Sequence, residues 1–250
     1  MQTYWTLTRR ELASYFLSLT GYVILAAVMF LTGLSFYLLL ASLRQEPTPM
    51  PLTEVFYLTP FFWFILVLST PVITMRLFAL EKFSGTFETL MTAPVSDLQV
   101  VLAKFTAAMV FYMLMWAPLL ACIFIVRHFT NDSATLEGGA IGSTFLGIFL
   151  LGCLFLSLGC LGSSLTRSQI VAAMVSFAGA LSLFFVSFLG DRLELQTGWP
   201  AQVFSYVALV DHMQDFASGT VDTRPIVFCV TLTVVFLFLT LRAVESRRWK

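Results

Sequence analysis

The residues that could carry chemistry lie in short polar stretches between long apolar runs. A phosphate-binding P-loop needs Gly-Lys-Ser/Thr, but Lys82 and Lys104 are each followed by phenylalanine and Lys250 is the last residue. The sequence therefore cannot bind ATP through that motif. It also lacks HExxH and GxSxG, so zinc-protease and serine-hydrolase chemistry has no support. We expect no catalytic residue, no cofactor-binding residue and no metal ligand in this chain.

A histidine with acidic neighbours occurs at two places in the sequence. Asp211, His212 and Asp215 would approach one another on a helix, and His128 is followed by Asp132. Such groups could hold a metal ion, but a histidine beside acids in a wet loop is more often a solvated surface, and we interpret both in that way. The four cysteines stand in apolar runs without zinc-like spacing and are expected to pack as small apolar side chains: Cys122, Cys153, Cys160 and Cys229.

The most informative polar stretch, residues 81–97, carries charges of both signs. Ser84 and Gly85 are expected to end a preceding helix, and residues 86–91 could form a short helix that stops before Pro94. A rigid helix with a polar tip could receive force from a soluble partner. The alternative is an ordinary solvated loop, and the residues alone do not decide between the two.

The elements that must position these residues are membrane helices. The sequence is 58% hydrophobic and only 11% charged, with a mean hydropathy of +0.89, whereas a soluble domain carries about 25% charged residues. A spanning helix needs about 20 uncharged apolar residues, and the gaps between charged residues provide six such segments. We therefore predict an all-α integral membrane protein with a single domain, 1–250, and six spans at about 21–43, 56–78, 97–126, 140–165, 168–189 and 225–243.

The basic residues predict the orientation of these spans. Six spans place both termini on one side, together with ten of the 14 Lys and Arg residues. Lysine and arginine gather in cytoplasmic loops, so both termini are expected in the cytoplasm, in a multi-pass protein of the bacterial inner membrane. The formal net charge is zero, which gives no indication of nucleic acid as a partner.

The predicted spans contain no Asp, Glu or His within their apolar cores. Ion- and proton-coupled carriers usually place such residues inside the membrane as relay sites. Their absence from the predicted cores disfavours a self-sufficient channel or secondary carrier, which we keep as a third hypothesis. It favours an external motor as the source of energy.

Two capping boxes predict where helices begin. Thr8 with Glu11 predicts a short helix before the first span, at about residues 3–18, and Ser96 with Gln99 predicts the start of the third span. The first helix is expected to lie in the cytoplasmic interface as an elbow, although a simple cytoplasmic extension of the first span is the alternative. Its apolar face would be formed by Trp5, Leu12 and Phe16, with Arg9 and Arg10 on the wet side.

The remaining loops and the fourth span carry weaker signals. Residues 43–55 contain three prolines and are expected to form an extended, stiff connector. The longest exported loop, 190–225, is expected to contain a helical piece near 204–216. The fourth span is rich in glycine, beginning with Gly138-x-x-x-Gly142, which favours close helix packing inside the bundle over a subunit interface.

The stretch EKFSGTFETLMTAPVSDLQVVLAKF resembles the first cytoplasmic loop of ABC-2-type transporter permeases. In that family a Glu-Lys/Arg-x-x-Gly-Thr-x-Glu-x-Leu-x-x-x-Pro pattern forms the coupling helix that docks on an ATPase. The matching residues are Glu81, Lys82, Gly85, Thr86, Glu88, Leu90 and Pro94. The resemblance therefore implies a coupling helix between the second and third spans.

The two ends of the sequence are similar to the same family. Its gliding-motility-type subgroup has a Gly-x-Val/Ile-Asp-x-Arg segment before the last span and closes on Glu-x-Arg-Arg-Trp. The matching residues here are Gly219, Val221, Asp222, Arg224, Glu245, Arg247, Arg248 and Trp249. The early Arg9-Arg10-Glu11 resembles the elbow helix, and the exported loop contributes Asp211, His212, Asp222 and Arg224 as candidate site residues. Before the histidine this sequence has Ala208-Leu209-Val210-Asp211 where the family often has Ser-Pro.

The resemblance implies a set of partners and a function. Such permeases pair with a separate cytoplasmic ATPase, which binds the ATP and Mg²⁺, and with a second copy of the permease or a related one. In the gliding-type subgroup a membrane protein with a large exported domain often joins the complex. The expected function is the membrane subunit of an ATP-driven transporter, and an exporter. The alternative is a mechanotransmission or scaffolding subunit that moves an exported partner without transporting a substrate.

Overall fold

The computed structural model describes residues 2–45, 52–87, 95–130, 138–192 and 207–246. Helices make up 90% of the structure, and no strand occurs in these ranges. The helices are α1 (Gln2–Phe16), α2 (Leu19–Gln45), α3 (Leu52–Leu58), α4 (Pro60–Thr74), α5 (Ala79–Ser84), α7 (Asp97–Met115), α8 (Ala117–Thr130), α9 (Gly138–Leu165), α10 (Gln169–Arg192), α12 (Leu209–Ser218) and α13 (Thr223–Glu245).

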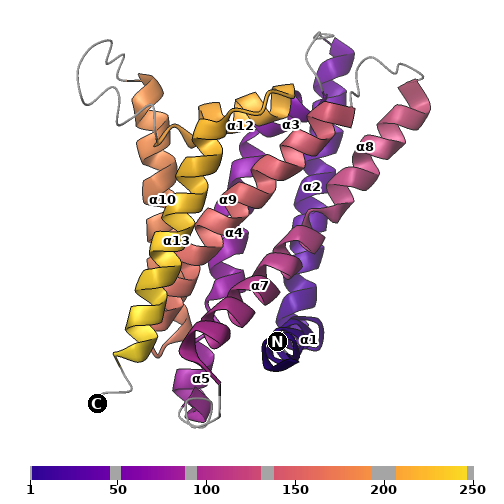
Figure 1. The fold of residues 1–250 in the computed structure, drawn as a ribbon. Coiled ribbons are helices and arrows are strands. Elements are labelled where there is room, and N and C mark those ends of the chain that lie inside the picture. The colour runs from indigo at the N-terminus through magenta and orange to yellow at the C-terminus, as the bar shows by residue number, and fades with distance from the viewer. Residues whose placement is uncertain (1, 46–51, 88–94, 131–137, 193–206, 247–250) are drawn as a thin grey trace, which may run out of the picture.

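Six stretches of this bundle are long and apolar enough to cross a membrane, which confirms the predicted fold class. The termini of the described chain and α5 lie at one end of the bundle, whereas α3 and α12 lie at the other (Figure 1). The stretches are Leu19–Ser42, Pro60–Ser84, Asp97–Ile125, Gly138–Leu165, Gln169–Ser187 and Thr223–Glu245.

The connector before the second span differs from the prediction. Of the predicted connector 43–55, residues 43–45 belong to α2 and residues 52–55 to α3, whereas residues 46–51, which hold its three prolines, lie outside the described residues. The break between α3 and α4 falls at Thr59, whose backbone is extended (φ −69°, ψ 139°). The cause of the break is Pro60, since a proline disfavours the helical conformation of the residue before it. Proline also pre-sets the first turn of the next helix, so α4 begins there and not at residue 56.

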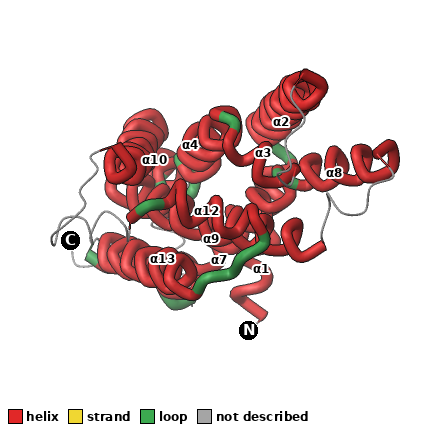
Figure 2. The backbone as a smooth tube through the Cα atoms, turned by 90° about the horizontal axis from the view of Figure 1, so that it is seen from above, coloured by secondary structure: helices red, strands yellow, loops and turns green. Residues whose placement is uncertain are grey.

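The glycine-rich helix α9 lies in the middle of the bundle. It contacts α4, α7, α10, α12 and α13, and the view along the bundle shows it among them (Figure 2). A Cβ atom at Gly152 would approach the Tyr112 ring to 2.3 Å, and one at Gly159 would approach Thr74 Oγ1 to 2.2 Å. Because these two glycines have no side chain, α7 and α4 can approach α9 closely. The glycines therefore serve packing within the bundle.

The close contact at Gly152 gives a prediction about stability. We expect Gly152→Ala to lower the thermal-unfolding midpoint of the purified protein, because forcing a methyl group into a packed core costs about 1–3 kcal/mol. Gly142→Ala in the same helix is the control, since a Cβ atom there meets no atom within 4 Å. The control should be neutral or slightly stabilising, because alanine favours the helix over glycine. Equal midpoints for the two variants would contradict the close packing.

The end of the bundle opposite α5 is closed by α3 and α12, which contact each other. The Tyr57 hydroxyl of α3 donates to the Val210 carbonyl of α12. Gln214 Nε2 donates to Glu54 Oε1 at 3.3 Å, and the Val210 N–H donates to Ser187 Oγ of α10 at 3.1 Å. The helix predicted near residues 204–216 begins at Leu209 and ends at Ser218 in the structure.

Candidate functional site

The N-terminal helix α1 is fastened to α7 by polar residues. The Tyr4 hydroxyl donates to Thr106 Oγ1 at 3.0 Å, and the Tyr15 ring stacks on Phe111 with the ring centroids 4.8 Å apart. Together with Thr8 and Glu11, the two tyrosines recur at positions 4, 8, 11 and 15, the spacing of one helix face. Beside this face, the Phe16 ring also packs edge-on against Phe111 with the centroids 5.7 Å apart, so the seam combines polar and aromatic contacts.

The structure differs from the predicted elbow helix in two details. The capping box at Thr8 is wrong, because α1 begins at Gln2 and the Thr8 hydroxyl donates to the Tyr4 carbonyl at 3.0 Å, as a mid-helix threonine commonly does. Leu12 and Phe16 pack against the protein core, while Trp5 is 69% exposed. The predicted apolar face is therefore divided between the bundle and the outside. Its position in the membrane interface stays a prediction.

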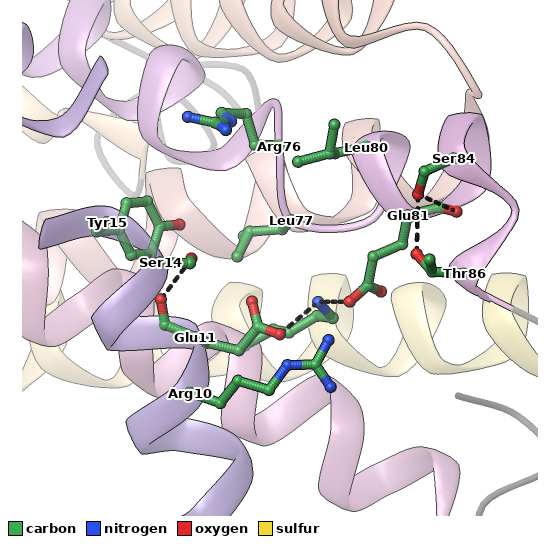
Figure 3. A pocket seen from close by; sticks show the side chains of 11 residues that line it. Arg10, Glu11, Ser14, Tyr15, Arg76, Leu77, Leu80, Glu81, Ser84 and Thr86 are labelled. Carbon is green, nitrogen blue, oxygen red and sulfur yellow. Dashed lines mark hydrogen bonds and ion pairs between the residues drawn. The ribbon is translucent and has the colours of Figure 1, made fainter. Parts of the chain in front are cut away.

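A buried lysine joins three helices at this end of the bundle. Lys104 of α7 lies 3.0 Å from Glu11 Oε1 of α1 and 2.9 Å from Glu81 Oε1 of α5 (Nζ to oxygen). Figure 3 shows Glu11 and Glu81 pointing toward each other from the two ends of the dashed ion-pair lines. The Lys104 side chain is 2% exposed and each glutamate 13%. We call these three residues the Lys104 triad.

Lys104 lies inside the third span. The helix α7 begins at Asp97, seven residues before Lys104, and a rise of about 1.5 Å per residue places the lysine about 10 Å along the helix. Ser96 Oγ accepts a hydrogen bond from the Gln99 N–H at 3.3 Å, so the predicted start of this helix is confirmed. A buried charge is usually retained only when it is paired, and the two glutamates pair the Lys104 ammonium.

A cavity of about 240 Å³ opens beside the triad. Arg10, Arg76, Ser84 and Thr86 line it together with the triad residues. Arg76 Nη1 donates to Thr20 Oγ1 of α2 at 3.0 Å, and Glu81 Oε2 is buried with no hydrogen-bond partner among the residues that the structure describes. The cavity therefore combines charged groups of both signs with the apolar side chains of Leu77 and Leu80, and α1, α5, α7 and the turn at residues 75–78 meet around it.

The short helix α5 turns its two predicted charges inward. Glu81 pairs with Lys104, and Lys82 donates from Nζ to the Ser164 carbonyl at the end of α9. The carbonyls at the C-terminal end of a helix lack partners within the helix and carry partial negative charge, so a lysine suits this place. A direct contact of Glu81 or Lys82 with a partner chain stays a prediction. In the structure both side chains fasten α5 to the bundle.

The outer side of α5 presents a different set of residues. Phe83 is 76% exposed, and Ser84, Gly85 and Thr86 are exposed beside it. Gly85 ends α5 in the left-handed conformation (φ 75°), which confirms the predicted break. The Ser84 and Thr86 hydroxyls lie 2.8 Å apart within hydrogen-bond distance. We call residues 83–86 the docking face.

Sequence reasoning missed Phe83 and Lys104. Phe83 is one of 26 phenylalanines and stands next to charges, so nothing marked it as exposed. Lys104 was taken only as a cytoplasmic marker, although a lysine seven residues into a predicted span was a visible signal. Arg9 and Arg10 are exposed on α1, as predicted. The remaining predicted residues of the coupling loop lie outside the described residues: Glu88, Leu90 and Pro94.

The candidate site residues of α12 and the start of α13 serve mainly to end and begin helices. Gly219 ends α12 in the left-handed conformation (φ 95°), and Asp222 caps α13 by accepting a hydrogen bond from the Arg224 N–H at 3.2 Å. Asp211 and Arg224 are exposed. No group of three His, Cys, Asp or Glu residues suited to a metal ion occurs among the residues that the structure describes.

His212 of α12 gives a pH-dependent prediction. Burial lowers the pKa of this imidazole, and Asp215 and Asp222 oppose the shift only in part. The folded protein therefore favours the neutral ring, so its stabilising contribution is full above the unfolded pKa of about 6.5 and is lost as the pH falls below it. The thermal midpoint of the wild type should fall more between pH 7.5 and pH 5.5 than that of His212→Gln. Parallel falls would contradict the prediction.

The comparisons agree with the helical architecture. A family profile described as ABC-2 family transporter protein matches residues 42–242. The matched stretch runs from α2 into α13 and includes α5, Lys104 and the whole of α9. None of the curated proteins compared with the chain matches it. Since the profile covers most of the sequence and the six apolar helices, this chain belongs to the ABC-2 family of transporter proteins.

Proposed function

We propose that this membrane permease of an ABC transporter is driven by a separate cytoplasmic ATPase that binds the docking face. The observation that carries the proposal is the construction of α5. Its inner side is fastened by Glu81 and Lys82, while its outer side presents Phe83 at 76% exposure beside a left-handed Gly85. Exposed aromatic residues on a rigid support are common anchors of protein interfaces.

The remaining expectations belong to the same proposal. The end that carries α5 and both termini faces the cytoplasm of a bacterial cell, across its inner membrane, because most Lys and Arg residues belong to that side. The partner ATPase binds ATP and Mg²⁺, and a second permease copy or a related one completes the translocation unit. Transport runs outward. The gliding-motility-type subgroup, and with it an auxiliary membrane subunit, is supported by the C-terminal resemblance alone.

A second candidate function is mechanotransmission without transport. The layer of α3 and α12 favours it, because two hydrogen bonds join α12 to the bundle at the end opposite α5. The Val210 N–H donates to Ser187 Oγ of α10 at 3.1 Å, and Ser143 Oγ of α9 donates to the Phe216 carbonyl at 2.6 Å. Motion of the bundle would then move an exported partner. The two functions share the ATPase and differ only in whether a substrate crosses the membrane.

Reconstitution tests the proposal. The tagged chain is purified with the ATPase that accompanies it, that ATPase is identified by mass spectrometry, and both are placed in proteoliposomes. ATP-dependent movement of a labelled lipid or solute supports transport. ATP hydrolysis that depends on the permease without any movement supports mechanotransmission. Failure of every ATPase to associate with the wild-type chain would contradict both functions.

Glu88, which the family resemblance places in the coupling helix, provides a variant. We expect Glu88→Lys to uncouple ATP hydrolysis from transport while the chain still inserts, because reversing a charge at an interface replaces attraction by repulsion. The measurement is the ratio of transported substrate to ATP hydrolysed in the same proteoliposomes. Asp215→Lys, an exposed acid on α12, is the control. Normal coupling in the Glu88 variant would remove this residue from the docking contact.

A further inference from the structure

The second span is broken where its sequence gives no reason for a break. The helix α4 ends at Thr74 and α5 begins at Ala79, with Met75–Phe78 in turns between them. These four residues are Met-Arg-Leu-Phe, which include neither glycine nor proline and have fair to good helix propensity. Pro71 lies one turn earlier, and the Met75 N–H still bonds to its carbonyl at 2.9 Å. A local cause is therefore absent at the break itself.

A serine of the neighbouring helix α9 occupies the broken turn. Ser163 Oγ accepts hydrogen bonds from the N–H groups of Phe78 and Ala79, both at 3.1 Å, and donates to the Met75 carbonyl at 3.3 Å. The hydroxyl thus replaces bonds that the backbone would otherwise make within a helix. A side chain inserted into the hydrogen-bond ladder is a known cause of sharp bends. Ser163 is completely buried, so water cannot take its place.

The other side of the break is held by α1. In a continuous helix the Ile73 carbonyl would accept from Leu77, but the Leu77 N–H bonds to the Thr74 carbonyl at 3.1 Å instead. The Tyr15 hydroxyl donates to the Ile73 carbonyl at 3.0 Å and satisfies it. The bend is therefore completed by side chains from two other helices and is a tertiary feature.

The C-terminal end of α9 contacts the second span on both sides of the break. Gly159, one turn before Ser163, is in close contact with Thr74, and the carbonyl of Ser164 accepts from Lys82. Residues before, at and after the break therefore contact the same one and a half turns of α9. Since the bend interrupts the helix between α4 and α5, α5 is connected to the bundle through α9 by Lys82 and Ser163 and through α7 by Glu81, and not through an unbroken helix to α4.

We infer that Ser163 is the positioning residue that fixes the direction of α5 and passes its movement to α9. This inference rests on the proposed function, in which α5 receives the ATPase. The central helix α9 contacts α10, α12 and α13. Movement received at Ser163 therefore reaches these three helices, of which α12 belongs to the layer opposite α5. Ser163 acts through its hydrogen bonds to the backbone of Met75, Phe78 and Ala79, and it does not touch a substrate.

The test compares Ser163→Ala with Ser157→Ala. Both serines are completely buried in α9, but the Ser157 hydroxyl donates only to the Leu154 carbonyl of its own helix, at 2.8 Å. In the purified permease alone, we expect hydrogen exchange at the Phe78 and Ala79 amides to rise at least about tenfold in Ser163→Ala and to stay unchanged in Ser157→Ala. Lys82 and Glu81 hold α5 in place, so the amides lose a partner and the helix does not simply straighten.

The second measurement uses the complex with the identified ATPase in proteoliposomes. Ser163→Ala should bind this ATPase with wild-type affinity and yet lose at least about tenfold in transport per ATP hydrolysed. If Ser163→Ala fails to insert, Lys82→Met, which removes the other link between α5 and α9, is measured in the same two ways and is expected to show the same loss of coupling.

The outcomes separate the inference from the proposed function. Unchanged exchange at residues 78 and 79 would overturn the role of Ser163 in holding the break, whatever the partner does. Raised exchange with wild-type coupling would overturn the transmission to α9, because the serine would then serve only local structure. A wild-type chain that binds no ATPase would overturn the proposed function and the transmission with it, and the exchange result would still decide the hydrogen bonding of the break.

Discussion

Replacing Lys104 with methionine is expected to destabilise this protein by about 3–5 kcal/mol, the usual cost of removing one partner from a buried ion pair. Methionine fills a similar space, so the loss comes from Glu11 and Glu81, which would stay buried at 13% exposure without a counter-charge. A change of roughly 1 kcal/mol moves the midpoint of a protein of this size by about 2–4 °C. The thermal midpoint of the detergent-purified variant should therefore fall by at least about 6 °C.

The triple variant Lys104→Met, Glu11→Gln and Glu81→Gln is the matched control for this prediction. It removes the whole charge network and leaves no unpaired charge, and such replacements are often close to neutral. We expect it to recover most of the lost midpoint. If the triple variant is as unstable as the single one, the ion pairs are not the cause, and loss of the contact between Lys104 Nζ and the Phe78 ring, 5.5 Å from its centroid, would explain the result.

Truncation of Phe83 to alanine is expected to weaken ATPase binding by at least about thirtyfold, which corresponds to roughly 2 kcal/mol for an interface hot spot. The reason is that this exposed ring stands on a helix that is held rigidly by the Glu81–Lys104 ion pair and by the hydrogen bond from Lys82 to the Ser164 carbonyl. A rigid aromatic anchor loses little conformational entropy on binding, so its contact area contributes fully. Binding is measured by titrating the purified ATPase onto the permease in nanodiscs.

Phe64→Ala is the control for the Phe83 variant. Phe64 is 55% exposed near the start of α4, at the other end of the apolar stretch Pro60–Ser84, so its truncation removes the same ring away from the docking face. It should leave ATPase affinity unchanged. Equal affinity of Phe83→Ala and the wild type would remove the ring from the interface. Equal losses in both variants would show a general effect of ring removal on the bundle.

The membrane helices were predictable because the bilayer imposes a constraint on composition that acts at every position. A span must be long, apolar and free of unpaired charge, and six stretches of this sequence meet that demand. Helix ends with local causes were predictable as well. Ser96 caps α7 and Gly85 ends α5 through contacts within a few residues, which the sequence displays directly.

The prediction failed where the cause lies elsewhere in the chain. Thr8 has the sequence of a capping residue, but α1 begins earlier because its polar face packs along α7. Residues 52–55 were expected to be extended, yet α3 is stabilised by contacts with α12, more than 150 residues later. The bend at 75–78 has no local signal and depends on Ser163 and Tyr15.

The sequence by itself determined six long apolar helices, and it predicted the side on which the basic residues gather and the loop that would meet a soluble partner. Hydrophobicity, charge and capping act locally, and they can be counted along the chain. Only the tertiary structure decided that Glu81 and Lys82 point inward, that Phe83 points outward, and that Lys104 joins α1, α5 and α7. The direction of a side chain and the partner of a buried charge depend on which helices lie beside each other, and that arrangement is fixed by packing between distant segments.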